Sequence, residues 1–298
     1  MRARAPGKLV LSGAYAVLYG APAIVTAVSR YAIADTGRAA EFVTPEVRAA
    51  IGDRCAPWFD ASELRGSEGK LGLGSSAAIL VASLAALELA AGSSGQDAGL
   101  AAAVFEPALV AHRAAQGGGS GVDVACAAHG GTLIVRRTEA QLATEAVRLP
   151  GGLVWEVWAG GAPTSTSSYV AQVAELAQRE PALFEERLEA LRRAAEAAAE
   201  AVRRGDAGGL VAQLDHQRRG LSALGQAAGI EIVTPALAEL GALAVAEGAV
   251  VIPSGAGGGD VAVFVGLAPP SSALTLRRER FGHTRLQLSF AARGVHAC

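Results

Sequence analysis

The sequence predicts an α/β protein of two domains, and three features lead to this expectation. The chain has 298 residues, which is enough for two domains of ordinary size. Hydrophobic residues make up 51% of the chain but aromatic residues only 5%, so alanine and small aliphatic side chains must fill a core of packed helices and strands. The alternation of apolar and polar stretches starts again near Gly151 and Gly152. We therefore expect one domain over residues 1–152 and a second over residues 153–298.

The first half is expected to begin with strands and to continue with helices. Apolar stretches broken by Gly and Pro over residues 8–35 predict strands joined by turns, with the sequences LVLSG, AIVTAV and YAIAD. Residues 36–68 are polar and irregular, with one short strand or turn around CAPWF. The segment SSAAILVASLAALELAAG predicts a helix that a glycine ends. A second helix is expected over residues 97–116, with Pro107 as a candidate kink or break. A glycine loop, a short helix and a strand follow.

The second half is expected to contain a strand, several helices and a further glycine loop. VWEVWAG predicts a strand, and GGAPTSTSSYV a loop that runs into a helix. Further helices are predicted over residues 181–204, 206–228 and 234–247. Thr234 and Pro235 suit the cap and first position of the last of these. VVIPSGAGGGDVAVFVG predicts a strand, a glycine loop and then another strand or helix.

Charge and cysteine content exclude several classes of protein. The net charge of −2 gives no reason to expect nucleic acid or a membrane surface as a partner. Cys55, Cys126 and Cys298 have no paired spacing, so we expect neither a disulfide framework nor a zinc site, and a reduced, cytoplasmic protein. No apolar stretch of about 20 residues predicts a membrane span. The basic N-terminus loosely resembles a signal peptide, but Gly and Pro interrupt its apolar run.

Lysine occurs only twice in the chain, and both copies stand beside glycine. Lys8 lies in APGKLVLSG and Lys70 in GKLGLGSS, whereas the other 24 of the 26 Lys and Arg residues are arginine. Lysine is a compact charge on a flexible stem, and the rigid fork of arginine does not replace it at a crowded phosphate. A chain that otherwise uses arginine is therefore expected to keep lysine where phosphate chemistry requires it.

Three glycine-rich loops point to phosphate binding. GLGSS runs directly into a predicted helix, whose free N–H groups and dipole attract an anion. Ser75 and Ser76 can cap this helix or reach a phosphate-bound Mg²⁺. QGGGSGVD places Asp123 after a glycine run, and SGAGGGD is a third such loop. One loop of this kind is often only a turn or a helix cap, but three beside the lysines or an acid favour a phosphate site.

Two common phosphate motifs do not explain the GLGSS loop. A Walker A loop needs a lysine directly before its final Ser or Thr, and none stands between Gly74 and Ser75. The dinucleotide pattern G-x-G-x-x-[GA] is formally matched by Gly72, Gly74 and Ala77. It requires a preceding apolar strand, yet ASELRGSEGK is polar, and no acidic residue stands about 20 positions on.

Together the three segments resemble the GHMP kinase superfamily, named for galacto-, homoserine, mevalonate and phosphomevalonate kinases. APGKLVLSGAYAVLYG resembles its first motif, GLGSSAA its second and SGAGGGD its third, in the correct order over nearly the whole chain. The resemblance implies a two-domain GHMP kinase fold with its site in the cleft between the domains. The N-terminal domain would contain a left-handed βαβ unit, and the C-terminal domain would be ferredoxin-like.

Within the superfamily, further segments resemble the phosphomevalonate kinase family. These are K-x-G-L-G-S-S, AHRAAQGGGSGVDVA, WAGGAPTSTS and GIEIVTPALAEL. Mevalonate kinases are less similar, because their first motif usually continues G-E-H where this chain has Ala14 and Tyr15 after the glycine. They also have a metal-binding Glu eleven residues before the catalytic Asp, where this chain has His112. The chain is short for the family, and the missing length falls between residues 35 and 70.

The resemblance implies ATP-dependent phosphorylation of 5-phosphomevalonate to 5-diphosphomevalonate, in the mevalonate route to isoprenoids. Lys70, Lys8 and Asp123 would be catalytic. Lys70 would bridge the transferred group and the acceptor, and Lys8 would hold Asp123 or the acceptor. The residues implied to bind ATP are Gly72, Leu73, Gly74, Ser75, Ser76 and Ala77, with Ser76 or alternatively Ser75 coordinating Mg²⁺. The residues implied to bind the acceptor are His112, Ser120, Gly121, Ser165, Gly255, Ala256 and Gly257.

The role of Asp123 depends on the acceptor. An alcohol needs a base to remove its proton, whereas a phosphate is largely dianionic at pH 7 and needs none. We therefore expect Asp123 to orient Lys8, Mg²⁺ or the substrate. The alternatives are mevalonate kinase or another GHMP kinase acting on a small alcohol, a decarboxylase of the same superfamily, and a catalytically silent nucleotide-binding homologue. The expected partner is a small-molecule substrate, and the expected assembly is a monomer or homodimer.

Overall fold

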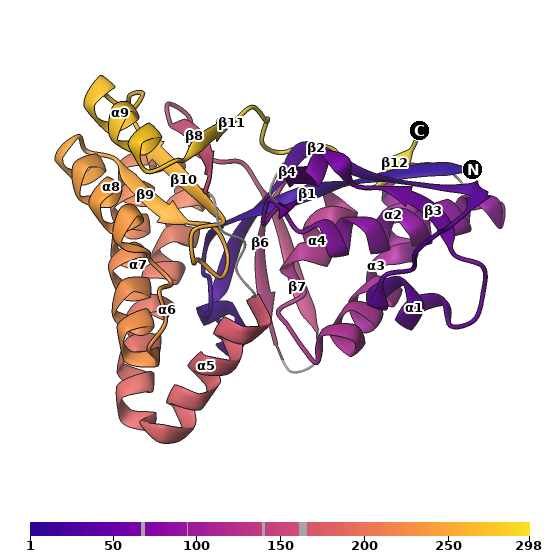
Figure 1. Ribbon diagram of the computed structural model, residues 1–298, viewed down its shortest axis with the longest axis horizontal. Coiled ribbons are helices and arrows are strands. Elements are labelled where there is room, and N and C mark those ends of the chain that lie inside the picture. The colour runs from indigo at the N-terminus through magenta and orange to yellow at the C-terminus, as the bar shows by residue number, and fades with distance from the viewer. Residues whose placement is uncertain (67–68, 94, 139–140, 161–165) are drawn as a thin grey trace.

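The α/β prediction is confirmed by a computed structural model that describes residues 1–66, 69–93, 95–138, 141–160 and 166–298. Within these ranges, the chain forms a larger sheet with helices α1–α4 on one side of the molecule and a smaller sheet with helices α5–α9 on the other (Figure 1). The first helix of the second group is α5 (Thr166–Arg179). The two ends of the chain lie close together at the far edge of the larger sheet, because β12 (His296–Ala297) pairs with β1 (Arg2–Ser12).

The larger sheet is antiparallel throughout, with the strand order β12-β1-β2-β6-β7 and with β3 also paired to β2. Its other strands are β2 (Pro22–Ala39), β3 (Pro57–Asp60), β6 (Thr132–Arg137) and β7 (Leu142–Val147). The prediction of separate strands for AIVTAV and YAIAD is wrong, because both belong to the single long strand β2. β1 pairs with residues 24–35 of this strand, with register shifts between Pro6 and Gly7 and between Val10 and Ser12.

Helices cover one face of this sheet. α2 (Ser75–Ala90) packs on β1 and β2 and is itself covered by α3 (Asp97–Gln116) and α4 (Val122–His129). α2 is apolar on nearly every side, because it is enclosed by the sheet and by these neighbours. α3 continues through Pro107 without a break. A proline ring removes one helical hydrogen bond, and the remaining turns of this long helix keep it continuous.

A short helix, α1 (Pro45–Ile51), lies within residues 36–68, which were expected to be irregular apart from one short strand or turn. The Oγ1 atom of Thr44 accepts a hydrogen bond from the backbone N–H of Val47 at 3.3 Å, and Pro45 occupies the first turn. α1 packs against α3. The short strand expected around CAPWF is confirmed as β3. The remaining small elements near it are η2 (Ser62–Leu64), β4 (Arg65–Gly66) and β5 (Gly69–Lys70).

The smaller sheet has the antiparallel order β11-β8-β10-β9. Its strands are β8 (Val154–Ala159), β9 (Val250–Pro253), β10 (Val261–Gly266) and β11 (Thr284–Leu286). Side chains alternate between its faces. Trp158 and Phe264 pack beneath α8 (Pro235–Ala246) and α9 (Ser272–Arg280). Val157 and Val263 face the opposite side and belong to the cluster that also contains the buried apolar side chains of α6 (Pro181–Arg204) and α7 (Ala207–Ala228).

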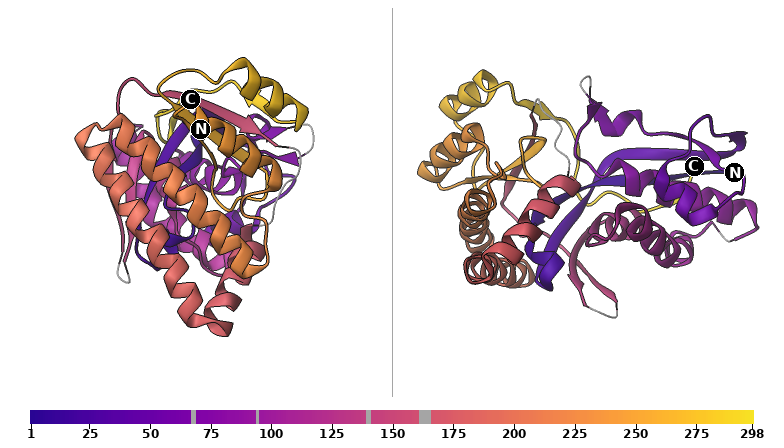
Figure 2. Two further views of the ribbon diagram at one scale, coloured as in Figure 1. Left: turned by 90° about the vertical axis from the view of Figure 1, so that its left-hand side faces the viewer. Right: turned by 60° about the horizontal axis from the view of Figure 1, so that its bottom comes forward.

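One cluster of buried apolar residues runs from the larger sheet into the helices on the smaller one. α6 packs on α7 and also contacts β2, so this helix pair links the two halves, which lie side by side in Figure 2. The division at residues 1–152 and 153–298 falls in the turn between β7 and β8 and stays a prediction, as does the handedness of the βαβ unit. All three cysteines are free. Within the ranges given above, no helix is long and apolar enough to cross a membrane.

Candidate active site

Two adjoining cavities lie where the three glycine loops meet. The α2 cavity, of about 660 Å³, contains the start of α2 in its wall, together with Glu46 and Gln116. The η1 cavity, of about 160 Å³, is named after the short helix η1 (Ala16–Tyr19) and lies beneath it and the two later glycine loops. The residues that line both cavities are Lys8, Gly72, Asp123, Thr166 and Asp260. These shared residues form a common wall at which occupants of the two cavities would meet.

The start of α2 is suited to an anion. Gly74 is its N-cap, with a left-handed φ of 77°, and no side chain caps the helix. The expectation that the serines cap the helix is therefore wrong, because the glycine takes the cap position and the serines become its first two residues. The first N–H groups of a helix have no partner within it, and the helix dipole adds partial positive charge there. Ser75 and Ser76 line the α2 cavity beside these groups.

Lys8 is held against the GLGSS loop. Its backbone N–H donates to the Leu73 carbonyl at 2.8 Å, and its Nζ donates to the Gly72 carbonyl at 3.4 Å. Nζ also lies 3.9 Å from Oδ2 of Asp123, which α4 presents from its first turn. A Cβ atom on Gly74 would lie 3.0 Å from Cγ of Lys8. The glycine thus leaves room for the lysine stem, and the lysine is only 7% exposed.

The third glycine loop is fastened to the first motif. The Tyr15 hydroxyl donates to the Ala256 carbonyl at 2.6 Å, and the Val10 backbone N–H donates to Oγ of Ser254 at 3.0 Å. Burial raises the pKa of Tyr15, so the hydroxyl keeps its proton and remains a donor. A Cβ on Gly257 would lie 2.2 Å from the Ile232 carbonyl, so this loop passes too close to its neighbour for any side chain there. These contacts bring the first and third motifs together over the η1 cavity.

The structure gathers most of the predicted site residues around the two cavities. Those that line a cavity are Lys8, Gly72, Gly74, Ser75, Ser76, Ser120, Asp123, Gly255 and Ala256. Leu73 and Ala77 are buried in the core behind the start of α2. Gly121 is the N-cap of α4, with a φ of 79°. Neither Gly121 nor Gly257 lines a cavity, although each follows or precedes a residue that does.

Three predicted residues need separate mention. His112 lies buried on α3 and lines neither cavity, and within the described part of the chain neither of its ring nitrogens has a hydrogen-bond partner. Ser165 lies outside the described residues, and so does the side chain of Lys70. The backbone of Lys70 belongs to β5, which pairs with Arg65 in the β4–β5 hairpin. The catalytic role of Lys70 therefore stays a prediction.

The cavity walls also contain residues that the sequence reasoning missed, among them Tyr15, Glu46, Gln116, Thr166 and Asp260. Asp260 ends the SGAGGGD loop and Gln116 begins QGGGSGVD, so their position beside a glycine loop was an available signal. Glu46 had no such signal, because it stands in a polar segment with no glycine motif.

Comparisons with known proteins give a consistent result. No protein-family model matches the sequence. A phosphomevalonate kinase from Streptomyces sp. (strain CL190) is 28% identical over 373 aligned positions, which cover 98% of this chain and 97% of that protein. The aligned region is longer than the 298 residues of this chain, so the relative contains segments that this chain lacks.

Solved structures resemble the whole chain. A Lin0012 protein from Listeria innocua has a TM-score of 0.84 at 24% identity and covers 99% of this chain and 98% of its own. Streptococcus pneumoniae phosphomevalonate kinase, in complex with phosphomevalonate and AMPPNP, has a TM-score of 0.77 at 20% identity. The match covers 97% of this chain and 99% of that one. L. major mevalonate kinase in complex with R-mevalonate has a TM-score of 0.71 at 20% identity. The match covers 98% of this chain and 96% of that one. The chain has the GHMP kinase fold.

The resemblance found in the sequence implies a magnesium ion, and the oxygen atoms of the α2 cavity suit one. Mg²⁺ prefers oxygen ligands and is usually held by one or two carboxylates together with substrate phosphates and water. The cavity offers the hydroxyls of Ser75 and Ser76 and the carboxylates of Glu46, Asp123 and Asp260. Among the residues that the structure describes, no three His, Cys, Asp or Glu side chains gather into a metal-binding group. The residues present therefore fit a cation that the phosphates help to hold.

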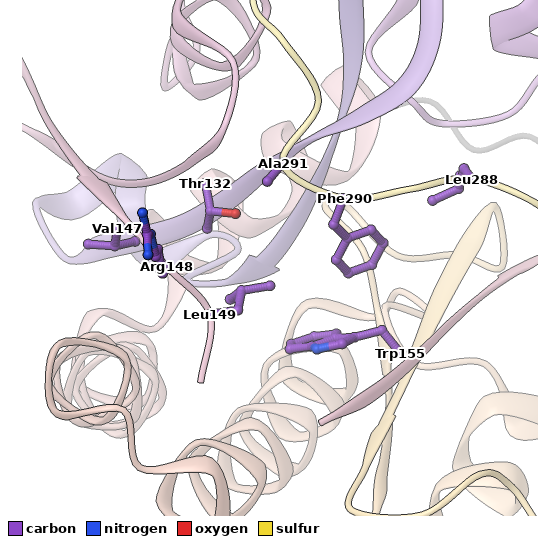
Figure 3. A pocket seen from close by; sticks show the side chains of 8 residues that line it. All are labelled: Thr132, Val147, Arg148, Leu149, Trp155, Leu288, Phe290 and Ala291. Atoms are coloured by element: carbon purple, nitrogen blue, oxygen red, sulfur yellow. The ribbon is translucent and has the colours of Figure 1, made fainter. Parts of the chain in front are cut away.

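A third cavity in this GHMP kinase fold contains none of the predicted site residues. It has a volume of about 460 Å³ and lies between the two sheets, where Trp155 and Phe290 face each other with ring centres 5.5 Å apart (Figure 3). Thr132, Arg148 and Leu149 contribute to its other walls. We therefore assign the candidate active site to the α2 and η1 cavities.

Proposed function

We propose that the chain transfers the terminal phosphoryl group of ATP to the phosphate of 5-phosphomevalonate. The observation that carries this proposal is the common wall of the two cavities, with Lys8 and Asp123 between the uncapped start of α2 and the η1 cavity. The α2 cavity would receive the triphosphate, and the smaller η1 cavity would receive the acceptor. The two reacting groups would then meet at Lys8.

Phosphoryl transfer depends mainly on positioning and on neutralising charge, and the α2 cavity provides both. The N–H groups of the first turn of α2 would bind the phosphate oxygens, and the Ser75 and Ser76 hydroxyls would add donors. Lys8 would place its positive charge beside the transferred group. Bound Mg²⁺ would supply further neutralisation of the phosphate charge.

Asp123 would act by holding Lys8 rather than by removing a proton. Its carboxylate lies 3.9 Å from the Lys8 Nζ, and Lys8 also donates to the Gly72 carbonyl, so the ammonium group is directed from two sides. A phosphate acceptor has a second pKa of about 6 and is already nucleophilic at pH 7. A base is therefore not needed for this acceptor.

The choice of phosphomevalonate over mevalonate rests on the motifs and on the curated relative. The segments AHRAAQGGGSGVDVA and GIEIVTPALAEL resemble the phosphomevalonate kinase family, and the 28% identical relative is a phosphomevalonate kinase. The GHMP kinase fold itself does not discriminate, because mevalonate kinase has the same fold.

The deciding experiment is ADP release by the purified protein with Mg-ATP, with 5-phosphomevalonate and mevalonate offered separately and the products identified by mass. We expect turnover with 5-phosphomevalonate alone. Turnover with mevalonate alone would overturn the proposed acceptor and restore Asp123 as a general base. ATP binding without turnover of either compound would indicate another acceptor or a silent homologue. The variant Lys8→Ala serves as the control for contaminating kinases.

A further inference from the structure

Glu46 is a buried carboxylate in the wall of the α2 cavity. It stands in the first turn of α1 and is only 7% exposed. In the part of the chain that the structure describes, no Lys, Arg or His nitrogen lies within 4.0 Å of its carboxylate oxygens. A buried charge normally has a partner of opposite sign, so this carboxylate lacks one that a bound cation would provide.

The surroundings of Glu46 keep it ionised. Burial raises the pKa of this carboxyl, but hydrogen bonds from Gln116, its own backbone N–H and Thr44, together with nearby His112, outweigh burial. The pKa of Glu46 therefore lies below its usual value, and the group carries a negative charge at pH 7.

One side chain places Glu46 next to Ser76. Nε2 of Gln116, at the end of α3, donates to Oε1 of Glu46 at 2.9 Å and lies 3.5 Å from Oγ of Ser76. Because both distances start from the same nitrogen, the distance between Oε1 of Glu46 and Oγ of Ser76 cannot exceed their sum. A cation with Mg–O distances of about 2.1 Å can contact both groups, either directly or through one water.

A negative charge in this wall conflicts with an anionic ligand. The start of α2 attracts phosphate, whereas ionised Glu46 beside Ser76 repels it. A divalent cation between the two removes the conflict, because it attracts both the carboxylate and the phosphate. Asp123 differs from Glu46 in having a described basic partner, because it faces Lys8, which offsets its charge.

We propose that Glu46 is the protein carboxylate that holds the divalent cation, together with Ser76, against the phosphates of the bound nucleotide. This assignment rests on the proposed nucleotide-binding function. It gives α1 a role in the site, although its segment has no phosphate-binding motif. Gln116 would be a positioning residue that keeps the carboxylate and the hydroxyl side by side.

The competing explanation is that Glu46 only anchors α1 to α3 through Gln116. The two explanations predict different effects of Glu46→Gln, which keeps the size of the side chain and one of its two acceptor oxygens but removes its charge. Loss of an anchor would weaken nucleotide binding equally with and without metal. Loss of a cation ligand would weaken only the metal-dependent part, and metal-free nucleotide would bind as well as before or better.

The test is the binding of AMPPNP by calorimetry, with Mg²⁺ and with EDTA, and the binding of Mn²⁺ to the AMPPNP complex by electron paramagnetic resonance. For Glu46→Gln we expect at least tenfold weaker Mn²⁺ binding and no loss of metal-free AMPPNP binding. Gln116→Ala should show a smaller loss of Mn²⁺ binding. Glu41→Gln, an exposed glutamate of the same segment, is the matched control and should behave as the natural chain does.

Melting curves of each variant establish that it is folded, and Glu46→Asp, which keeps the charge, should retain part of the Mn²⁺ affinity. Mn²⁺ affinity of Glu46→Gln within twofold of the natural chain, or equal weakening with and without metal, would overturn the inference. Failure of the natural chain to bind AMPPNP would overturn the proposed function as well. Because no acceptor is present, the outcome does not depend on whether phosphomevalonate is the substrate.

Discussion

At the scale of single residues, the pair Lys8 and Asp123 is the centre of the proposed chemistry. Both line the two cavities, and Lys8 is the more buried of the two side chains. The lysine supplies charge to a transferred phosphoryl group, whereas the aspartate acts through the lysine. Their loss should therefore have unequal effects.

We predict that Asp123→Asn lowers kcat with 5-phosphomevalonate by about tenfold. Lys8→Ala and Lys70→Ala should each lower it by about 100-fold or more, the usual effect of removing a charge that stabilises the transition state. Steady-state kinetics of the three variants provide the measurement. A loss for Asp123→Asn larger than that for Lys70→Ala would contradict the positioning role and favour a general base.

The ionisation of Glu46 gives a pH-dependent prediction. Its pKa is lower in the folded chain than its ordinary value, so its charge stabilises the fold above about pH 4.3, the usual pKa of an unfolded glutamate. That contribution disappears as the pH falls through the lower folded value. We expect Glu46→Gln to melt below the natural chain at pH 7 and the difference to shrink as the pH is lowered below about 4.3. A melting difference that is unchanged at pH 3 would show that the charge is not its cause.

At the scale of elements, the start of α2 can be tested separately from the stability of α2. Gly74 and Gly92 stand just outside the two ends of this helix, and both have positive φ, at 77° and 94°. A Cβ at Gly74 would press on the Lys8 side chain, whereas a Cβ at Gly92 would meet nothing within 4 Å. Alanine at either position strains the backbone by about 1–2 kcal/mol.

We predict that Gly74→Ala and Gly92→Ala lower the melting temperature by similar amounts, about 2–4 °C for each kcal/mol. Only Gly74→Ala should lower kcat, by tenfold or more, because only there is Lys8 displaced from the common wall. Melting curves and steady-state kinetics on the same preparations test this. Equal activity in the two variants would contradict the link between the GLGSS loop and Lys8.

Local signals account for what the sequence could predict, and tertiary packing for what it could not. Helix α2 and its glycine loop were predictable, because a loop of small residues running into an apolar helix is encoded within one short segment. The continuous strand β2 was not, because its second half is held by pairing with β1 and with β3, which lie outside its own segment. Glu46 reaches the cavity only because α1 packs on α3, and no pattern within its own segment indicates that contact.

At the scale of the whole molecule, the two sheets share one core. The main apolar cluster includes Leu9 from β1, Leu80 from α2, Leu191 from α6 and Val263 from β10. A buried polar link adds to it, since the side chain of Gln217 in α7 accepts hydrogen bonds from the Gly13 backbone N–H at 2.7 Å and from the Ser12 hydroxyl at 3.2 Å. The candidate site lies between halves that depend on each other for burial.

We predict that both halves unfold together in urea, although a chain with two sheets could unfold in two steps. Hydrogen exchange followed by mass spectrometry should show peptides of α2 and of β10 losing protection at the same urea concentration. Gln217→Ala leaves the buried Gly13 N–H without its partner, which costs about 1–3 kcal/mol, and should lower both midpoints equally. If α2 and β10 instead lost protection at separate urea concentrations, the domains predicted at residues 1–152 and 153–298 would be independent units. The shared cluster would then be an interface between them.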